Sequence, residues 1–245
     1  MRGLCGYGVE GVAKDMLNIT PIASGSTGNA YHITDGRSPV LIEAGIQFKR
    51  IQKAINFKVS ELAGCLISHE HGDHSKAAQD VMKAGVDCYM TRGTAEALNV
   101  NGHRVKIITP LKQFKLKTWT VLPFPTQHDA MEPVGFLLQN QQKDKLLFLT
   151  DSFYCKYKFQ GLTHIMIECN YDIDILKNND LPPAHKKRVM QSHFSLANVK
   201  EFLRVNDLSK VVEIHLIHLS SQNSDAERFK REIEGLTGIP TIIAG

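Results

Sequence analysis

The chain of 245 residues lacks any long hydrophobic run, any closely paired cysteines and any large excess of one charge. No apolar stretch approaches the roughly 18 residues that a membrane-spanning helix needs, so no membrane partner is expected. The five cysteines are widely spaced without a Cys-x-x-Cys motif, which argues against a disulfide framework and a cysteine zinc site. Cys65 and Cys169 lie in or beside apolar runs, and we predict buried thiols in a reducing, cytoplasmic compartment.

The charge balance is only mildly basic, because 29 Lys and Arg residues face 25 Asp and Glu residues. A formal net charge of +4 permits an anionic ligand, but a dedicated duplex binder carries a denser basic stripe. Two short basic clusters, at 185–188 and 104–117, are interpreted as solvated surface rather than as a binding groove. The acidic, Asn-rich stretch 171–180 is interpreted as a loop.

No internal repeat, low-complexity tract or linker rich in Pro, Gly or Ser divides the chain, so we expect one domain over 16–245. Residues 1–15 lack the apolar segment of a secretory signal and are interpreted as a flexible leader. Short apolar or β-branched runs between turn residues predict strands, and apolar residues spaced by three or four predict helices. The expected strands are 19–22, 30–33, 40–43, 65–68, 106–108, 118–124, 134–138, 146–149, 162–168 and 211–217, and the expected helices are 48–55, 75–84, 94–98, 195–203 and 225–236. Their interleaving predicts a layered α/β protein.

One segment, Ser68-His69-Glu70-His71-Gly72-Asp73-His74, concentrates side chains that bind metals. Residues at i and i+2 of an extended chain point the same way, so His69 and His71 can share one metal ion. We expect Gly72 to allow a sharp turn after which Asp73 and His74 point to a second, adjoining metal position. Neutral imidazole suits zinc, and a carboxylate adds charge. A polar loop of solvated histidines is the alternative, which the predicted strand-loop-helix context disfavours.

Three further metal ligands are expected where predicted strands end, at His128, Asp151 and His218. Asp151 is the natural bridging ligand, because one carboxylate can hold two cations about 3.5–4 Å apart. His215 competes with His218, but a strand that continues to residue 217 leaves His218 at its end. The remaining histidines have no motif around them and are interpreted as structural: His32, His103, His164, His185 and His215.

With these motifs the chain resembles the metallo-β-lactamase superfamily. The resemblance rests on Glu43 after an early strand, His69-x-His71-x-Asp73-His74, His128, Asp151 and His218. It implies a four-layer αββα sandwich with two divalent metal ions, zinc or alternatively manganese, at one edge of the two sheets. The early acidic residue is often Asp in the family and is Glu43 here. Its implied role is to support the site, so the metal assignment stands.

The chain resembles the phosphodiester-hydrolysing branch of the superfamily more closely than it resembles the true lactamases. Those lactamases have Cys at the position of Asp151. The loop 23–29 is similar to the glycine-rich loop of YycJ-like proteins, and 192–195 to the histidine motif of the tRNase Z group. This resemblance implies that His193 protonates the departing sugar oxygen, help worth about 10²–10⁴-fold, with Glu168 orienting it. Asp73 is assigned to the catalytic group as well as to the metal ligands.

The favoured function is hydrolysis of small 3′,5′-cyclic nucleotides, which disarms a bacterial immune signal, because phage anti-Pycsar proteins share this architecture. The slight basic excess and the lack of an inserted RNA-binding arm also favour a small substrate. The alternative is a YycJ-like 5′ exonuclease on DNA. A nucleotide binder without turnover is disfavoured by the intact ligand set, and a thioesterase or glyoxalase-like hydrolase by the candidate acid His193.

Substrate contacts and assembly follow from the same resemblance. Ser24, Ser26 and Asn29 either donate hydrogen bonds to a phosphate or only form a tight turn, and the sequence leaves both possibilities open. The family often dimerises, so a homodimer is expected.

Overall fold

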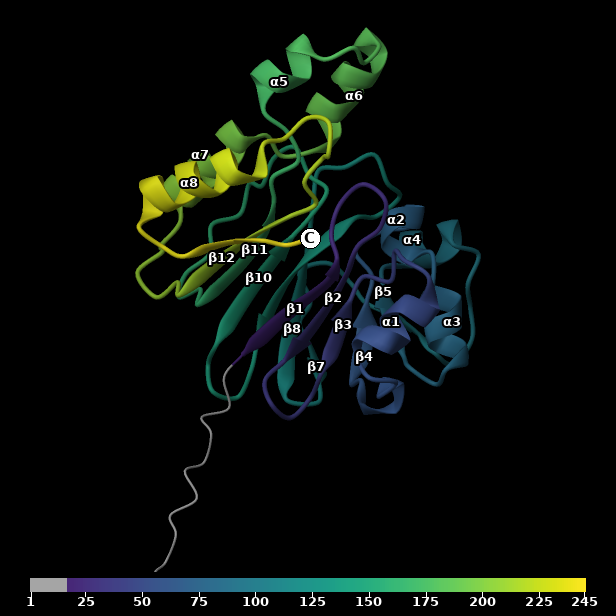
Figure 1. Ribbon diagram of the computed structural model, residues 1–245. Helices are drawn as coiled ribbons and strands as arrows, with labels where there is room; N and C mark the ends of the chain where they lie inside the picture. Colours follow the sequence, from purple (N-terminus) through teal and green to yellow (C-terminus); the bar gives the residue numbers. More distant parts are fainter. Residues whose placement is uncertain (1–16) are drawn as a thin grey trace, which may run out of the picture.

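Two β-sheets packed face to face between two layers of helices form the body of the protein (Figure 1). The computed structural model describes residues 17–245, and the leader expected at 1–15 lies outside the described residues. The four layers confirm the predicted αββα sandwich. In the described part of the chain, no helix is long and apolar enough to cross a membrane.

The first sheet has six strands, antiparallel from β1 to β3 and parallel from β3 to β6. In spatial order they are β1 (Asn18–Ala23), β2 (Ala30–Thr34), β3 (Val40–Ile42), β4 (Gly64–Leu66), β5 (Cys88–Met90) and β6 (Val105–Ile107). The outer helices of this sheet are α1 (Phe48–Ala54), α2 (Gly72–Ser75), α3 (Ala78–Lys83) and α4 (Arg92–Ala97), with a short 3₁₀ turn at Val59–Glu61.

The second sheet has seven strands, parallel from β10 to β13 and antiparallel from β7 to β10. In spatial order they are β13 (Thr241–Ile243), β12 (Glu213–Ile217), β11 (His164–Glu168), β10 (Lys145–Leu149), β9 (Val134–Gln139), β8 (Trp119–Pro125) and β7 (Phe114–Leu116). Two helices, α7 (Leu196–Val205) and α8 (Ala226–Thr237), cover this sheet, and α5 (Ile173–Asn178) and α6 (Pro183–Ser192) form a pair at one end of the sandwich (Figure 1).

The central core lies between the two sheets and joins them. Tyr31 of β2 contacts Phe148 of β10 edge to face, with ring centroids 5.5 Å apart. Trp119 is fully buried, and its indole nitrogen donates to the Ser38 carbonyl oxygen at 2.7 Å. A buried indole needs such a partner, because an unmet donor costs about 1–3 kcal/mol. This contact fixes how the two sheets face each other.

Several sequence predictions needed correction. The strands 88–90, 114–116 and 241–243 were missed, because three residues are too few to show an alternating pattern. The helix expected at 75–84 begins earlier and is divided into α2 and α3. The stretch 171–180 holds α5 instead of a loop, and Asp172 caps it by accepting from the backbone N–H of Asp174 and Ile175.

The predicted thiols are confirmed, since Cys65 and Cys169 are fully buried. Among the described residues all four cysteines are free. The apolar spacing of α7 is confirmed too, since Leu196, Val199 and Leu203 are buried against the second sheet.

Candidate metal centre

The candidate site lies where strands of both sheets end at the same edge of the sandwich. Parallel strands present their carboxyl ends together, so residues that directly follow them converge. The site residues and the strands they end or follow are Glu43 (β3), His69 and His71 (β4), His128 (β8), Asp151 (β10), Glu168 (β11) and His218 (β12). His215 lies inside β12, which confirms the preference for His218 as the residue at the strand end.

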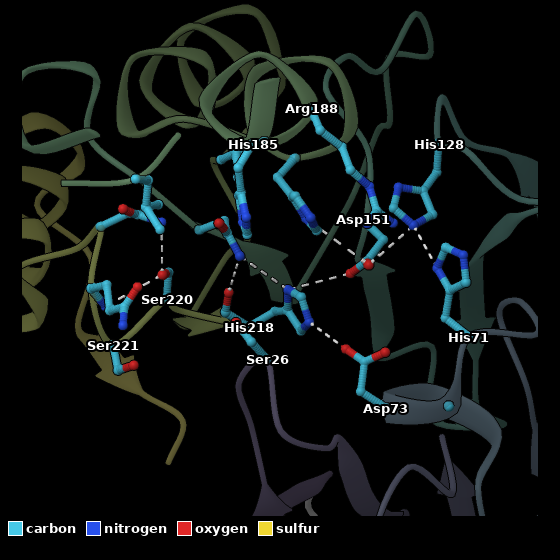
Figure 2. Close-up of a pocket in the computed structure, with 17 residues that line it drawn as sticks. Ser26, His71, Asp73, His128, Asp151, His185, Arg188, His218, Ser220 and Ser221 are labelled. Atoms are coloured by element: carbon cyan, nitrogen blue, oxygen red, sulfur yellow. Dashed lines mark hydrogen bonds and ion pairs between the residues drawn. The ribbon is translucent and has the colours of Figure 1, made fainter. Parts of the chain in front are cut away.

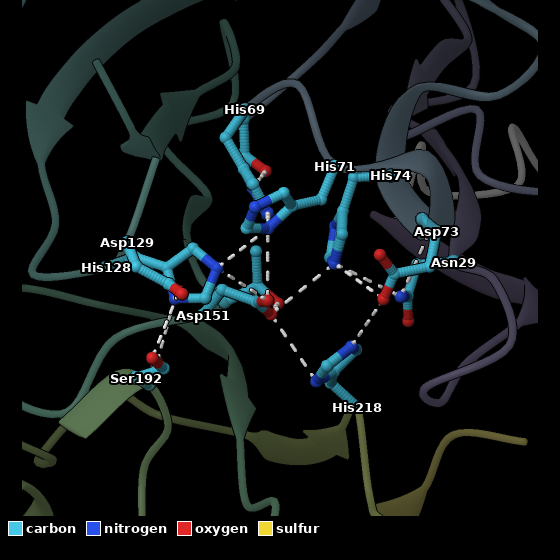
Figure 3. A network of polar contacts seen from close by, with 12 residues as sticks. Asn29, His69, His71, Asp73, His74, His128, Asp129, Asp151, Ser192 and His218 are labelled. Atoms are coloured by element: carbon cyan, nitrogen blue, oxygen red, sulfur yellow. Dashed lines mark hydrogen bonds and ion pairs between the residues drawn. The ribbon is translucent and has the colours of Figure 1, made fainter. Parts of the chain in front are cut away.

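A first group of ligand atoms belongs to His69, His71, His128 and Asp151, and all of them lie within 4.8 Å of one another (Figure 3). His71 Nδ1 lies 3.0 Å from His69 Nε2 and 3.1 Å from His128 Nε2. Asp151 Oδ2 lies 3.3 Å from His128 Nε2. Zn–N bonds of about 2.0–2.1 Å in a tetrahedron place neighbouring ligand atoms about 3.3 Å apart, so this group fits such an ion.

A second group adjoins the first and consists of Asp73, His74 and His218. Asp73 Oδ2 lies 3.2 Å from His218 Nε2 and 3.4 Å from His74 Nε2. The other oxygen of Asp151, Oδ1, lies 3.4 Å from His74 Nε2. Asp151 therefore offers one oxygen to each group, as a bridging carboxylate does. The predicted ligands converge in an arrangement that fits two divalent ions.

The electrostatics differ between the two groups, because the pKa of His69 is lowered, whereas at His218 Asp151 overcomes the effect of burial and the pKa is raised to about 10. Burial lowers the pKa of His69 well below its ordinary value, and nearby His74 lowers it further, so the ring is neutral and can act as a ligand. Burial alone would raise the pKa of Asp151, but His218 and His74 hold it well below its ordinary range. Burial likewise opposes ionisation of Asp73, and hydrogen bonds from His218 and His74 overcome it. Both carboxylates are therefore ionised.

Glu43 supports the second group from behind, as the sequence implied. Its Oε1 lies 3.6 Å from His74 Nδ1, the ring nitrogen that faces away from the site, and both side chains are fully buried. Its Oε2 accepts from the backbone N–H of Ser68, just before the histidine motif. A carboxylate behind a ligating histidine fixes the ring and raises its basicity.

Glu168 joins the metal groups to the candidate acid. Its Oε1 lies 2.6 Å from His193 Nδ1 and 3.0 Å from His218 Nδ1, and its Oε2 accepts from the backbone N–H of Ser152 and Phe194. Burial would lower the pKa of His193, but the Glu168 carboxylate and then Asp151 hold it above its ordinary value. The proposed orienting role of Glu168 therefore has the required geometry.

Three of these residues have strained backbones that the sequence did not indicate. Glu43, Asp151 and His218 have φ angles of 63°, 39° and 53°, in the left-handed region that residues other than glycine rarely adopt. Such strain costs on the order of 1–3 kcal/mol for each residue and concentrates at functional sites. Glu43 and His218 directly follow the ends of β3 and β12, and Asp151 is the second residue after β10, so all three lie in turns at the edge of the site.

The glycine-rich loop is mainly a scaffold. Ser24 Oγ is hydrogen-bonded to the Tyr31 hydroxyl and accepts from the His218 N–H, at 2.8 and 2.9 Å. Asn29 is fully buried, and its amide donates to the Asp73 carbonyl oxygen at 3.2 Å. Of the three predicted substrate contacts only Ser26 lines the pocket. Ser24 and Asn29 fit the alternative of a tight turn, because their polar atoms hold the backbone of the metal ligands, and substrate contact by them stays a prediction.

Gly45 is a positioning residue that the sequence analysis missed. A Cβ atom on it would lie 1.7 Å from the Asp73 carbonyl oxygen and 2.7 Å from the His74 nitrogen. The Gly45 N–H donates to the Asn29 carbonyl oxygen at 2.8 Å. The Asn29 N–H in turn donates to the Asp73 carbonyl oxygen, also at 2.8 Å. The signal was a glycine two residues after the strand-ending Glu43. Gly72 was predicted to make a sharp turn, but it begins α2, and a Cβ there would meet nothing within 4 Å.

A cavity of about 550 Å³ opens over the two metal groups. Figure 2 shows His185 and Arg188 of α6 pointing toward Asp151 and His218, with Ser220 and Ser221 at the other end of the cavity. His185 and Arg188 therefore border the cavity, although both are exposed, as expected for the solvated surface predicted at 185–188. Only the tertiary structure reveals that α6 lies over the cavity, because α5 and α6 form a separate helical pair at one end of the sandwich.

Arg188 also ties α6 to the metal ligands. Its Nε donates to Asp129 Oδ2 at 3.1 Å, and Asp129 Oδ1 accepts from the Ser192 hydroxyl at 3.0 Å. The Ser192 carbonyl oxygen lies 3.0 Å from His128 Nδ1, so the end of α6 orients a ligand of the first group.

Comparison with known proteins agrees with this geometry. Residues 39–218 match the beta-lactamase superfamily domain. The chain belongs to the β-lactamase superfamily. Exodeoxyribonuclease WalJ of Streptococcus pneumoniae serotype 2 (strain D39) is 28% identical over 223 residues, which cover 84% of this chain and 82% of WalJ. Exodeoxyribonuclease YycJ of Bacillus anthracis is 27% identical over 229 residues, which cover 86% and 85%.

Solved structures share the fold at lower identity. The metallo-beta-lactamase fold protein YhfI from Bacillus subtilis superposes with a TM-score of 0.71 at 15% identity, covering 94% of this chain and 97% of that one. Human tRNase Z, short form, has a TM-score of 0.61 at 14% identity, covering 92% and 95%. The predicted fold, the likeness to YycJ and tRNase Z and the class of metal-dependent hydrolase are confirmed.

Replacing Asp73 by alanine tests the second metal group. D73A removes the carboxylate between His74 and His218, so we expect about one divalent ion per chain instead of two, loss of turnover and little change in the unfolding midpoint. Elemental analysis of the purified protein measures the metal content. The control is D80A, which removes a surface carboxylate of α3 that is paired with Lys83. Full metal content and activity in D73A would contradict a two-metal site.

Replacing Gly45 by alanine tests the close approach of backbone behind the ligands. In G45A the new methyl group must displace the backbone at Asp73, so we expect a loss of about 3 kcal/mol in unfolding free energy and weaker metal retention. Denaturant unfolding and elemental analysis measure both. G72A, in the same motif but with open space around the new methyl, should keep both properties. Equal behaviour of the two variants would refute the role of Gly45.

Proposed function

We propose that this protein is a metal-dependent phosphodiesterase that removes nucleotides from the 5′ ends of DNA. The observation that carries the chemistry is His193, which borders the same cavity as both metal groups and is hydrogen-bonded to Glu168. A departing sugar oxygen is a poor leaving group that needs a proton, whereas a thiolate does not. This pair therefore favours a nucleotide phosphodiester over a thioester.

The residues of the site divide the chemistry between them. Two divalent ions, when bound by the two ligand groups, supply activation of water at neutral pH and polarisation of the phosphoryl oxygens. His193 Nδ1 is engaged by Glu168, which leaves Nε2 to deliver a proton to the departing oxygen. The carboxylate stabilises the protonated ring and holds its orientation. Zinc, with manganese as the alternative, stays a prediction.

DNA is preferred over cyclic nucleotides because of the relatives. WalJ and YycJ are both named exodeoxyribonucleases, and each aligns with this chain over more than four fifths of its own length. The cyclic-nucleotide hydrolysis favoured by the sequence remains the second candidate. The size of the cavity supports it, because about 550 Å³ lies within the range of about 300–1,000 Å³ typical of small-ligand pockets.

A comparison of substrates separates the two candidates. Metal-loaded protein is incubated with 5′-labelled DNA, single- and double-stranded, and with 3′,5′-cyclic nucleotides including the pyrimidine ones, with D73A as the blank. We expect mononucleotides from DNA and intact cyclic compounds in the chromatogram, with activity on DNA that falls steeply as salt rises. Rapid linearisation of the cyclic compounds beside untouched DNA would establish the second candidate instead.

Replacing His193 by alanine tests the general acid. In H193A we expect kcat on DNA to fall by about 10²–10⁴-fold, because the sugar oxygen leaves unprotonated. Hydrolysis of bis(p-nitrophenyl) phosphate should change little, because nitrophenolate leaves without a proton. Elemental analysis should find an unchanged metal content, and a loss of metal would make His193 a ligand instead. H103A, at an exposed histidine, is the matched control.

The homodimer expected from the family resemblance also stays a prediction. Gel filtration of the metal-loaded protein tests it.

A further inference from the structure

A second groove lies between segment 154–158, which begins three residues after Asp151, and α7. It has a volume of about 320 Å³ and is lined by Tyr154, Lys156 and Lys158 on one side and by Phe202 of α7 on the other. Phe194, next to the candidate acid His193, also lines it. Tyr154 is only three residues beyond Asp151, so its Cα lies at most about 11 Å from that of the shared metal ligand. The Tyr154 end of the groove is therefore close to the metal centre.

The start of this segment combines a fixed backbone with exposed aromatic rings. The N–H of Phe153 donates to the Gln127 carbonyl oxygen at 3.1 Å, and the Phe153 carbonyl oxygen accepts from the Asn198 amide at 2.9 Å. The Ser152 hydroxyl donates to the Tyr154 carbonyl oxygen at 2.7 Å. The side chains of Phe153 and Tyr154 are nevertheless 39% and 57% exposed. A surface held in place before binding loses little entropy when a ligand arrives.

The charge of the groove suits a polyanion. In the described part of the chain, Lys156 and Lys158 take part in no ion pair, and Lys156 Nζ lies 5.3 Å from the centre of the Tyr157 ring. Glu201, which also lines the groove, lies 3.9 Å from Arg204, so its charge is partly balanced. Surfaces that bind single-stranded nucleic acid commonly combine cationic side chains with aromatic rings.

We infer that this groove binds the bases of a single-stranded DNA end as it enters the metal centre. The inference rests on the exodeoxyribonuclease function proposed above and deepens it. Bases stack on the ring of Tyr154 without preference for sequence, because every base has an aromatic face. Lys156 and Lys158 contact the phosphates between them. The released nucleotide occupies the other end of the cavity, beside Ser220 and Ser221 (Figure 2).

Two variants test the groove, Y154A for stacking and the double variant K156Q/K158Q for charge. On a single-stranded oligodeoxythymidine of about ten nucleotides, we expect Y154A to raise KM about tenfold with little change in kcat. K156Q/K158Q should lower the slope of log affinity against log salt by about 1.4, which is about 0.7 for each phosphate that a lysine no longer neutralises. Neither variant should affect bis(p-nitrophenyl) phosphate, which is too short to reach the groove.

The control is F57A, which removes a ring that is 69% exposed beside α1, in the helical layer opposite α7. It should leave KM for DNA unchanged. An unchanged KM in Y154A, while the unaltered protein degrades DNA, would overturn the groove and leave the proposed function intact. A change of oligomeric state in Y154A with unchanged DNA affinity would also overturn it, because the groove would then be an interface between copies.

Binding without cleavage separates this inference from the proposed function. Fluorescence anisotropy of a labelled oligonucleotide measures affinity whether or not the protein cleaves DNA. If the unaltered protein binds the strand through Tyr154 but hydrolyses only cyclic nucleotides, the groove is supported and the exonuclease function is not. If it binds no single strand at all, both are overturned.

Discussion

The buried carboxylate of Asp151 is the constraint on which the rest of the site depends. It is 3% exposed, and an isolated carboxylate at such a place costs several kcal/mol unless positive charge surrounds it. His74, His128 and His218 approach it within 3.4 Å, and its two oxygens face different ligand groups. The left-handed φ of 39° at Asp151 adds strain at the same point. This edge of the sandwich therefore has the geometry and the charge to hold cations.

The two sheets contribute different parts of the chemistry. The first sheet and α2 supply the histidine motif, held from behind by Glu43 and by the close approach of backbone at Gly45. The second sheet supplies the shared carboxylate and Glu168, which links the ligand His218 to the candidate acid His193. Because the sheets are joined by a common core, the groups that bind cations and the group that moves a proton are held in one frame.

The side chains proposed to contact the substrate lie outside the two sheets, in elements that are added to the sandwich. The helical pair α5 and α6 brings basic side chains over one side of the cavity, and the segment after Asp151 carries exposed rings and lysines away from the other. A polymer needs both an exit for the released nucleotide and a track for the remaining strand, whereas a cyclic nucleotide needs only the cavity. The exonuclease function proposed above requires both approaches to the metals.

The sequence by itself determined the fold class and nearly the whole ligand set, because metal coordination demands particular side chains at short spacings and at strand ends. His69, His71, Asp73 and His74 are recognisable for that reason, and so are the residues after the long apolar strands. The tertiary structure alone decided the rest. Ser24 and Asn29 proved to be scaffold, while His185 and Arg188 proved to line the cavity, because burial and orientation depend on elements distant in the chain. Gly45 shows the same limit of sequence analysis. It matters because the backbone of Asp73 passes close to it, and no local sequence pattern indicates that contact.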